Sequence, residues 1–185
     1  PQACFVHQDV SSEADWDAVV AAATEQFGRI DVLVNNAALY FSCPVDEVEP
    51  ERVRRLLDVN VFGSWLGISK VAAVMKAQGT GGAIVNLSSL AGIRGIPTLA
   101  IYGASKAAIR GLTQAAAHDL GPAGIRVNAV LPGAVADTGM FSGGTPEQMQ
   151  AIPLQRPASL DEISTLVLFL ASDDASYITG ADHTI

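Results

Sequence analysis

The segment Tyr102-Gly103-Ala104-Ser105-Lys106 places a phenol and an ammonium group four residues apart. On a helix, residues i and i+4 share one face, so the side chains of Tyr102 and Lys106 can address one pocket. A phenol has a reference pKa of about 10, but a nearby cation favours the phenolate and lowers that pKa. The pair therefore predicts a tyrosine that exchanges protons. An inward-facing tyrosine beside a solvated lysine would have the same spacing, so the pair alone leaves both interpretations open.

A serine lies thirteen positions before the tyrosine. Asn86-Leu87-Ser88-Ser89 closes an apolar run typical of a buried strand, and a hydroxyl on Ser89 could hydrogen-bond a substrate oxygen beside the Tyr102 proton. A serine hydrolase would instead need a GxSxG frame and a paired base. Neither Ser88 nor Ser105 has that frame, so proton transfer is the favoured chemistry.

Alternating strands and helices must position these residues. The apolar runs predict strands over 3–7, 31–34, 83–87 and 125–131, and the helical periodicity predicts helices over 13–27, 50–76, 102–120 and 161–171. Strands that are apolar throughout, alternating with helices, predict a parallel sheet covered on both faces. We therefore expect a single domain over 1–185 with a doubly wound α/β fold of the Rossmann-like type.

Polar residues and turns follow the predicted strands. In doubly wound sheets, ligands bind beyond the carboxyl ends of the strands. The segments at those ends are Asp9, Asn35-Asn36, Ser88-Ser89 and Pro132-Gly133. Their convergence on one edge predicts the binding site.

The composition excludes several classes of protein. Apolar residues make up 49% of the chain and charged residues 16%, below the roughly 25% of an average globular chain, which argues against disorder. The net charge of −8 would repel phosphate backbones, so no nucleic-acid partner is expected. No apolar run approaches the roughly 20 residues of a membrane span. Cys4 and Cys43 are isolated, so no metal site is expected. With no signal peptide in view, we expect a cytoplasmic protein.

Together the motifs resemble the short-chain dehydrogenase/reductase family, especially its bacterial hydroxysteroid dehydrogenase-type members. The matching segments, in family order, are Asp9-Val10, Asn35-Asn36-Ala37-Ala38, Asn60 within Leu57-Asp58-Val59-Asn60-Val61, Ser89, Tyr102 with Lys106, and Arg126-Val127-Asn128-Ala129-Val130-Leu131-Pro132-Gly133. They span nearly the whole chain, and that combination is specific although no single motif is.

The resemblance implies an enzyme that transfers a hydride between a nicotinamide cofactor and a secondary alcohol or ketone. Tyr102 would exchange the proton with the substrate oxygen, and Ser89 would position that oxygen. Lys106 would lower the pKa of Tyr102 and hold the nicotinamide ribose. Asn60 would hold a helix backbone and a water that relays protons from Lys106 to solvent.

The resemblance also implies the cofactor residues. They are Asp9, Val10, Asn36, Ala37, Ala38, Tyr102, Lys106, Pro132, Gly133, Val135 and Thr138, the last lying one position later than the family's threonine. The chain opens at what would be the family's third strand, so we expect it to lack the N-terminal Gly-rich βαβ segment as well as the extreme C-terminus. The residue that separates NAD from NADP belongs to that segment. General likeness to the hydroxysteroid-type members favours NAD over NADP.

The resemblance also bears on the assembly, the substrate and the alternative functions. The family commonly forms dimers and tetramers, which implies a homo-tetramer. The apolar residues Met140, Phe141 and Met149 lie in a segment that resembles the family's substrate lid, with Ser142-Gly143-Gly144 as its hinge. They could accept a hydrophobic substrate or could equally be ordinary packing of that segment. The runner-up is a 3-oxoacyl-carrier-protein reductase using NADPH, for which Arg94 and Arg110 make too small a basic patch. A non-catalytic nucleotide-binding protein is a further alternative, but it would be expected to have lost Ser89, Tyr102 or Lys106.

Overall fold

The protein is described by a computed structural model over residues 3–141 and 143–185; Ser142 of the predicted hinge lies outside the described residues. Within the described part, parallel strands form one sheet in the order β1-β2-β3-β4. They are β1 (Val32–Asn35), β2 (Gly82–Leu87), β3 (Ile125–Leu131) and β4 (Asp182–Thr184). The helices are α1 (Glu13–Phe27), α2 (Pro50–Leu57), α3 (Gly63–Gln78), α4 (Ala100–Leu120), α5 (Pro146–Gln150) and α6 (Leu160–Ala171).

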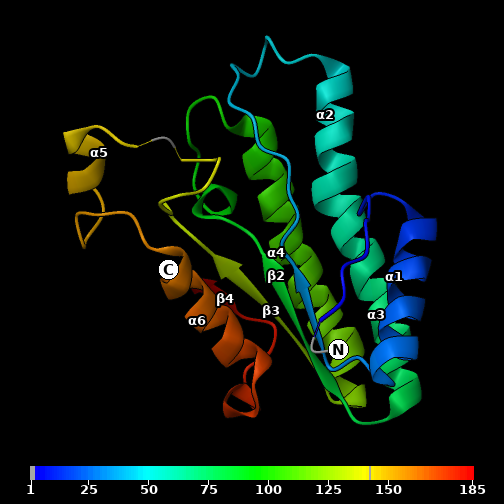
Figure 1. Ribbon diagram of the computed structural model, residues 1–185. Helices are drawn as coiled ribbons and strands as arrows, with labels where there is room; N and C mark the ends of the chain where they lie inside the picture. The colour runs from blue at the N-terminus through cyan, green and yellow to red at the C-terminus, as the bar shows by residue number, and fades with distance from the viewer. Residues whose placement is uncertain (1–2, 142) are drawn as a thin grey trace.

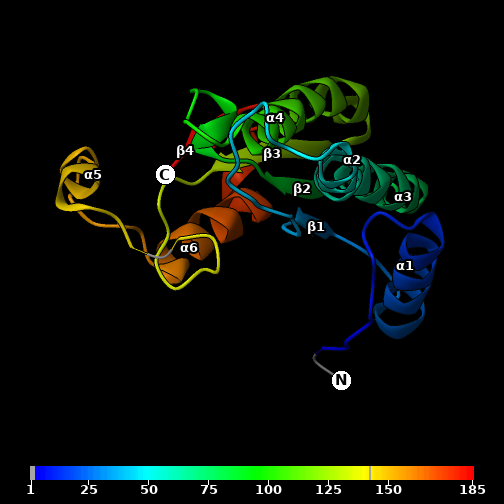
Figure 2. The ribbon, with the colours of Figure 1, turned by 90° about the horizontal axis from the view of Figure 1, so that it is seen from above.

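Helices cover both faces of the sheet, which confirms the predicted doubly wound α/β fold. Helices α3 and α4 lie on one face, with α1 packed beside α3, and α6 lies on the other face (Figures 1 and 2). Leu66, Met75 and Ile125 are buried between the sheet and α3 and α4. Val130 and Leu170 are buried on the opposite face, under α6.

The ends of α1 follow the expected capping chemistry. The Ser12 hydroxyl accepts a hydrogen bond from the Asp15 backbone N–H at 3.3 Å, and Gly28 ends the helix in the left-handed conformation at φ 79°. The Asp15 carboxylate in turn accepts from the backbone N–H of Asp9 at 2.8 Å. The start of α1 therefore fixes the segment that carries Asp9, one of the predicted site residues.

The strand predicted over 3–7 is wrong. These residues have no regular structure, and Phe5 is 90% exposed. A strand exists only when a neighbour completes its ladder of hydrogen bonds. None of the described strands pairs with residues 3–9, and β1 pairs with β2 alone. Local apolar character was therefore not sufficient to make a strand.

The long helix predicted over 50–76 contains an irregular turn. Helix α2 runs directly into a π turn, Asp58–Phe62, which runs directly into α3. A π turn accommodates one extra residue and is frequent at functional sites. This one buries Asn60, which is only 1% exposed.

A line of buried polar side chains ties the sheet to the helices. Asn35 and Asn86 are register partners on β1 and β2, and the Asn35 amide donates to Asn86 Oδ1 at 2.8 Å. The Asn86 amide donates to the Thr113 hydroxyl of α4 at 2.9 Å. Because unpaired buried amides are costly, these bonds fix α4 against the sheet next to the strand ends.

Candidate active site

Helix α4 carries Tyr102 and Lys106 on its inner face. The two side chains are 7% and 4% exposed, and Lys106 Nζ lies 5.7 Å from the centre of the Tyr102 ring. The interpretation with a solvated lysine is therefore wrong. Gly103 allows this placement, because a Cβ there would lie 2.7 Å from the backbone oxygen of Ala91. The close contact brings the turn that follows Ser89 against the first turns of α4.

The Tyr102 phenol is held in its neutral form. Burial raises its pKa, Tyr40 raises it further, and a hydrogen bond with Ser89 lowers it in part. The Ser89 hydroxyl also accepts from the backbone N–H of Ala91 at 3.1 Å. Burial is the largest of these causes, and the expected lowering of the Tyr102 pKa by Lys106 stays a prediction. A neutral phenol is the form that can donate a proton to a carbonyl oxygen.

Lys106 is a buried cation with a backbone partner. Its Nζ donates to the carbonyl of Leu87, at the end of β2, over 2.8 Å. Burial lowers its pKa from 10.5 to about 8. The ammonium is therefore charged at neutral pH and loses its proton not far above it.

Asn60 joins the π turn to two other elements. Its Oδ1 accepts from the Leu39 N–H at 2.7 Å, and its Nδ2 donates to the Leu39 carbonyl at 3.0 Å and to Ser105 Oγ at 3.1 Å. Its own backbone carbonyl accepts from the Ser64 hydroxyl at 2.9 Å. The side chain thus holds the loop after β1, whereas a helix backbone was expected, and it contacts α4 one residue before Lys106.

Several predicted cofactor residues line one hollow. Val10, Asn36 and Ala37 lie around a cavity of about 150 Å³ at the carboxyl end of β1. Gln8 also lines it, and the Nε2 atom of Gln8 is buried without a hydrogen-bond partner. A buried amide that lacks a partner costs free energy, which a polar ligand would recover. The hollow therefore offers an unpaired amide donor to a polar ligand.

Asp9 lies next to this hollow, and its carboxylate is hydrogen-bonded to other side chains of the protein. Its carboxylate accepts from the Ser11 hydroxyl at 2.6 Å and from Arg55 of α2 at 3.0 Å. The hydrogen bonds from Ser11, more than the Arg55 guanidinium, hold the pKa of Asp9 at about 2. Sequence reasoning missed Arg55, whose contact with Asp9 spans 46 positions.

Of the predicted residues after β3, Pro132 and Gly133 lie beside the segment that follows Ser89, whereas Thr138 lies in a separate turn. The Pro132 carbonyl accepts from the Leu90 N–H at 3.0 Å, which brings the Pro132-Gly133 turn beside the segment that follows Ser89. Thr138 lies in the following turn, where its hydroxyl donates to the Val135 carbonyl at 3.1 Å. Asp137 precedes it in the left-handed conformation at φ 57°. The Thr138 hydroxyl is thus bonded within its own turn.

The loop after β1 brings an unpredicted aromatic residue to the site. The ring of Tyr40 meets that of Tyr102 edge to face, with centroids 5.1 Å apart and planes at 83°. The available signal in the sequence was a pair of aromatic residues, Tyr40-Phe41, shortly after a strand end. Ala38, which was predicted to bind cofactor, precedes Leu39 in the same loop.

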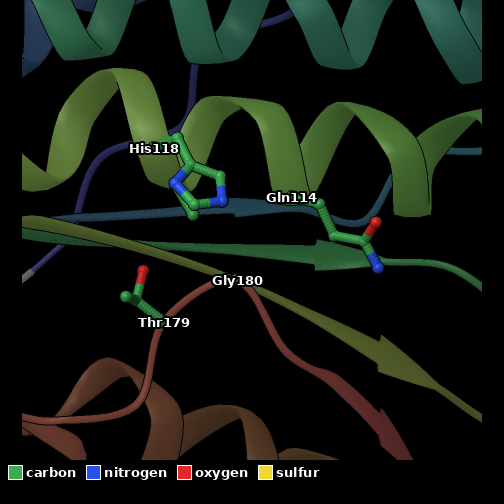
Figure 3. A pocket seen from close by; sticks show the side chains of 5 residues that line it. Gln114, His118, Thr179 and Gly180 are labelled. Carbon is green, nitrogen blue, oxygen red and sulfur yellow. The ribbon is translucent and has the colours of Figure 1, made fainter.

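Another hollow lies away from these residues. It has a volume of about 300 Å³ and is lined by Gln114, Ala117, His118, Thr179 and Gly180. Figure 3 shows Gln114 and His118 extending from α4 toward the turn at Thr179 and Gly180. His118 follows Tyr102 by sixteen residues, which is about 24 Å along a helix. This hollow is therefore separate from the candidate active site.

Metal sites and membrane spans were also sought. Over residues 3–141 and 143–185, no cluster of three His, Cys, Asp or Glu side chains is arranged to hold a metal ion. None of the helices in that part of the chain combines the length and apolar character that a bilayer crossing needs.

Known proteins are similar to this chain in sequence and architecture. Residues 1–185 match the family model described as enoyl-(acyl carrier protein) reductase. The chain is 44% identical over 183 residues to trans-4-hydroxycyclohexanecarboxylate dehydrogenase of Sinomonas cyclohexanicum, covering 99% of the chain and 69% of that relative. It is 42% identical over 181 residues to 3-alpha-(or 20-beta)-hydroxysteroid dehydrogenase of Mycobacterium tuberculosis H37Rv, covering 98% and 68%.

Solved structures of dehydrogenases and reductases have the same fold as this chain. Levodione reductase matches with a TM-score of 0.91 and 37% identity, covering 96% of this chain and 73% of that one. NAD+-bound xylitol dehydrogenase matches with a TM-score of 0.88 and 35% identity, covering 96% and 75%. Fold and site thus define an oxidoreductase that uses a nicotinamide cofactor to interconvert alcohols and ketones. The chain belongs to the short-chain dehydrogenase/reductase family.

Proposed function

We propose that Tyr102 is the proton donor and acceptor of this oxidoreductase, acting on secondary alcohols and ketones. The observation that carries the proposal is the buried pair of Tyr102 and Lys106 on α4, with Ser89 hydrogen-bonded to the phenol. A cation and a phenol that share a buried site are suited to acid–base chemistry.

In the direction of reduction, the Ser89 hydroxyl donates to the carbonyl oxygen of the substrate and orients it. The neutral phenol of Tyr102 then gives its proton to that oxygen. The charge of Lys106 favours the phenolate that remains. In the direction of oxidation, the same groups act in reverse, and Tyr102 takes the alcohol proton. When bound, the nicotinamide cofactor supplies or accepts the hydride.

Other residues hold the cofactor in this proposal. Val10, Asn36 and Ala37 bind its adenosine end in the hollow beside β1, with Ala38 next to them and Asp9 contacting the adenine. Lys106 and Tyr102 bind the nicotinamide ribose. Pro132, Gly133, Val135 and Thr138 contact the nicotinamide amide. Asn60 keeps the loop after β1 in place against α4, a part supported by its three hydrogen bonds to Leu39 and Ser105.

We favour NAD over NADP and a substrate that contains a carbon ring. NAD is supported by the structural neighbour that was solved as an NAD+-bound xylitol dehydrogenase. The substrate class is supported by two relatives whose names specify a hydroxycyclohexanecarboxylate and a hydroxysteroid. Tyr40 places aromatic surface beside Tyr102, which suits such compounds.

A reductase of acyl-carrier-protein thioesters is less well supported. The description of the matching family model favours it. However, such a carrier is acidic and would need exposed basic side chains. Arg110, one of two candidates, is bonded to Asp182 at 2.7 Å and to the Gly92 carbonyl at 2.9 Å. That leaves Arg94 alone on this part of the surface.

We also propose a cytoplasmic homo-tetramer. Apolar side chains on the outside of the helices support the assembly: Phe62 and Trp65 stack with ring centroids 5.5 Å apart, yet they remain 44% and 46% exposed. A second copy of the chain would cover such a surface. The cytoplasmic location rests on the composition alone.

The test of function is Tyr102→Phe. The substitution keeps the ring but removes the exchangeable proton, so turnover of cyclohexanone with NADH or NADPH should fall by roughly 10² or more. Tyr177→Phe is the matched control, because Tyr177 is fully exposed; it should leave turnover unchanged. Turnover by Tyr102→Phe at the level of the unmodified protein would remove Tyr102 from the mechanism.

A further inference from the structure

Tyr40 presents part of its ring to solvent beside the reactive phenol. Its edge-to-face contact with Tyr102 occupies one side of the ring, and the residue as a whole is 38% exposed. Tyr102 itself is only 7% exposed. Because the Tyr40 ring contacts that of Tyr102, a substrate whose oxygen lies at Tyr102 has the Tyr40 ring nearby.

The loop that carries Tyr40 is fixed on both sides of it. On one side, Asn60 holds both the N–H and the carbonyl of Leu39. On the other side, the Cys43 N–H donates to the Thr98 carbonyl at 2.8 Å, and the hydroxyls of Ser42 and Thr98 are hydrogen-bonded. The position of the Tyr40 ring is thus set by contacts with two other segments of the chain.

The Thr98 contact is made from a strained backbone. Thr98 lies at φ 64°, in the left-handed region that a β-branched residue rarely occupies. Strain of this kind persists where surrounding contacts determine the conformation, and it concentrates at functional sites. Here the contacts are those with Ser42 and Cys43. The strained residue therefore serves to hold the loop of Tyr40.

Phe41 is more enclosed than its neighbour Tyr40. It packs against the buried cluster of Leu56, Ala91 and Tyr102, and the Arg52 guanidinium lies 4.5 Å over its ring. With one side of Phe41 packed and Arg52 lying over its ring, that residue is half-buried. Of the two aromatic residues in this loop, Tyr40 is the more exposed.

We propose that Tyr40 is a specificity-determining residue, whose ring packs against the carbon ring of an alicyclic alcohol or ketone. The inference rests on the proposed function, because it takes the substrate oxygen to lie at Ser89 and Tyr102. Apolar stabilisation grows with the area removed from water. A six-membered ring extends over the Tyr40 ring, whereas the methyl groups of a small acyclic ketone cover little of it. Selectivity between the two classes follows from that difference.

The test compares kcat/KM for cyclohexanone and for acetone in the unmodified protein, Tyr40→Phe and Tyr40→Ala. We expect Tyr40→Ala to lose about tenfold with cyclohexanone, through KM, and less than about twofold with acetone. Tyr40→Phe should retain both values. Tyr40→Leu replaces Tyr40→Ala if the latter fails to give the circular dichroism spectrum of the unmodified protein, because leucine fills space without a flat ring.

Three results would overturn the inference. An equal loss with both ketones would show that Tyr40 acts only by supporting Tyr102. A loss in Tyr40→Phe would show that the phenol hydroxyl binds a polar group of the substrate. Unchanged kinetics in Tyr40→Ala would show that no packing occurs.

A measurement without turnover separates this inference from the proposed function. Saturation-transfer NMR reports contact between the protein and the ring protons of cyclohexanol. Loss of transfer in Tyr40→Ala, with transfer retained in Tyr177→Ala, supports the inference even if no ketone is reduced. Transfer that is the same in all variants overturns it, whatever the activity.

Discussion

Replacing Lys106 by methionine should make the protein more stable while impairing its chemistry. The ammonium is 4% exposed, and burial lowers its pKa from 10.5 to about 8. At about 1.4 kcal/mol per pKa unit, keeping Lys106 protonated in the folded state costs about 3 kcal/mol at pH 7. Methionine keeps an unbranched side chain without the charge. The substitution also removes the 2.8 Å bond to the Leu87 carbonyl, which offsets about 1–2 kcal/mol of the gain.

The effect should depend on pH in a defined direction. The unfolded chain holds the Lys106 proton up to its ordinary pKa, whereas the folded chain releases it near pH 8. Between pH 8 and 10.5 the unfolded state therefore binds more protons, and the unmodified protein gains stability as pH rises. The advantage of Lys106→Met, about 1–2 kcal/mol at pH 7.5, should shrink by about 2 kcal/mol by pH 9.5.

Urea unfolding followed by circular dichroism at pH 7.5 and pH 9.5 measures both quantities. Lys76→Met on the exposed side of α3 is the matched control, and it should change the free energy of unfolding by no more than about 0.5 kcal/mol at either pH. A Lys106→Met variant that is less stable at pH 7.5 by more than 1 kcal/mol would refute the reasoning. So would a difference from the unmodified protein that is the same at both pH values.

Two further predictions concern packing and assembly. Gly103→Ala should lower the free energy of unfolding by about 1–3 kcal/mol, because its Cβ would meet the Ala91 carbonyl oxygen at 2.7 Å. Gly95→Ala is the control, because its Cβ would have nothing within 4 Å, and it should leave the free energy of unfolding unchanged. Thermal unfolding of both variants measures the difference. An unaffected Gly103→Ala would contradict the close contact of α4 with the turn after Ser89. Light scattering at micromolar concentration should give a mass near that of four chains of 19.2 kDa, and the mass of a single chain would exclude the tetramer.

Sequence patterns were sufficient where the cause of a structure is local. Strand β3 has the predicted bounds, Ile125–Leu131, because a continuous apolar run lies between turn residues. Helix α6 begins one residue before the prediction, since Ser159 and Glu162 form a capping box at its start. The helical spacing of Tyr102 and Lys106 likewise placed both side chains on one inner face.

Other features depend on contacts between distant parts of the chain. The burial that raises the pKa of Tyr102 and lowers that of Lys106 comes from the packing of α4 on the sheet, which spacing along the helix does not reveal. The position of Tyr40 depends on Asn60 and Thr98, which lie 20 and 58 residues further along the chain. The absence of a strand over 3–7 could not be predicted from the local sequence either, because it reflects the lack of a pairing partner among the described residues.

The π turn at Asp58–Phe62 makes this part of the chain intolerant of changes in length. Its extra residue rotates all that follows by about 100° relative to a regular helix. Because of that rotation, α2 directs Arg55 to Asp9, while α3 directs Leu66 into the core. Deleting a single residue here would restore a regular helix and turn one of these faces away from its partner. Among relatives, a one-residue gap in this turn should therefore occur only together with the loss of the contact between Asn60 and Leu39.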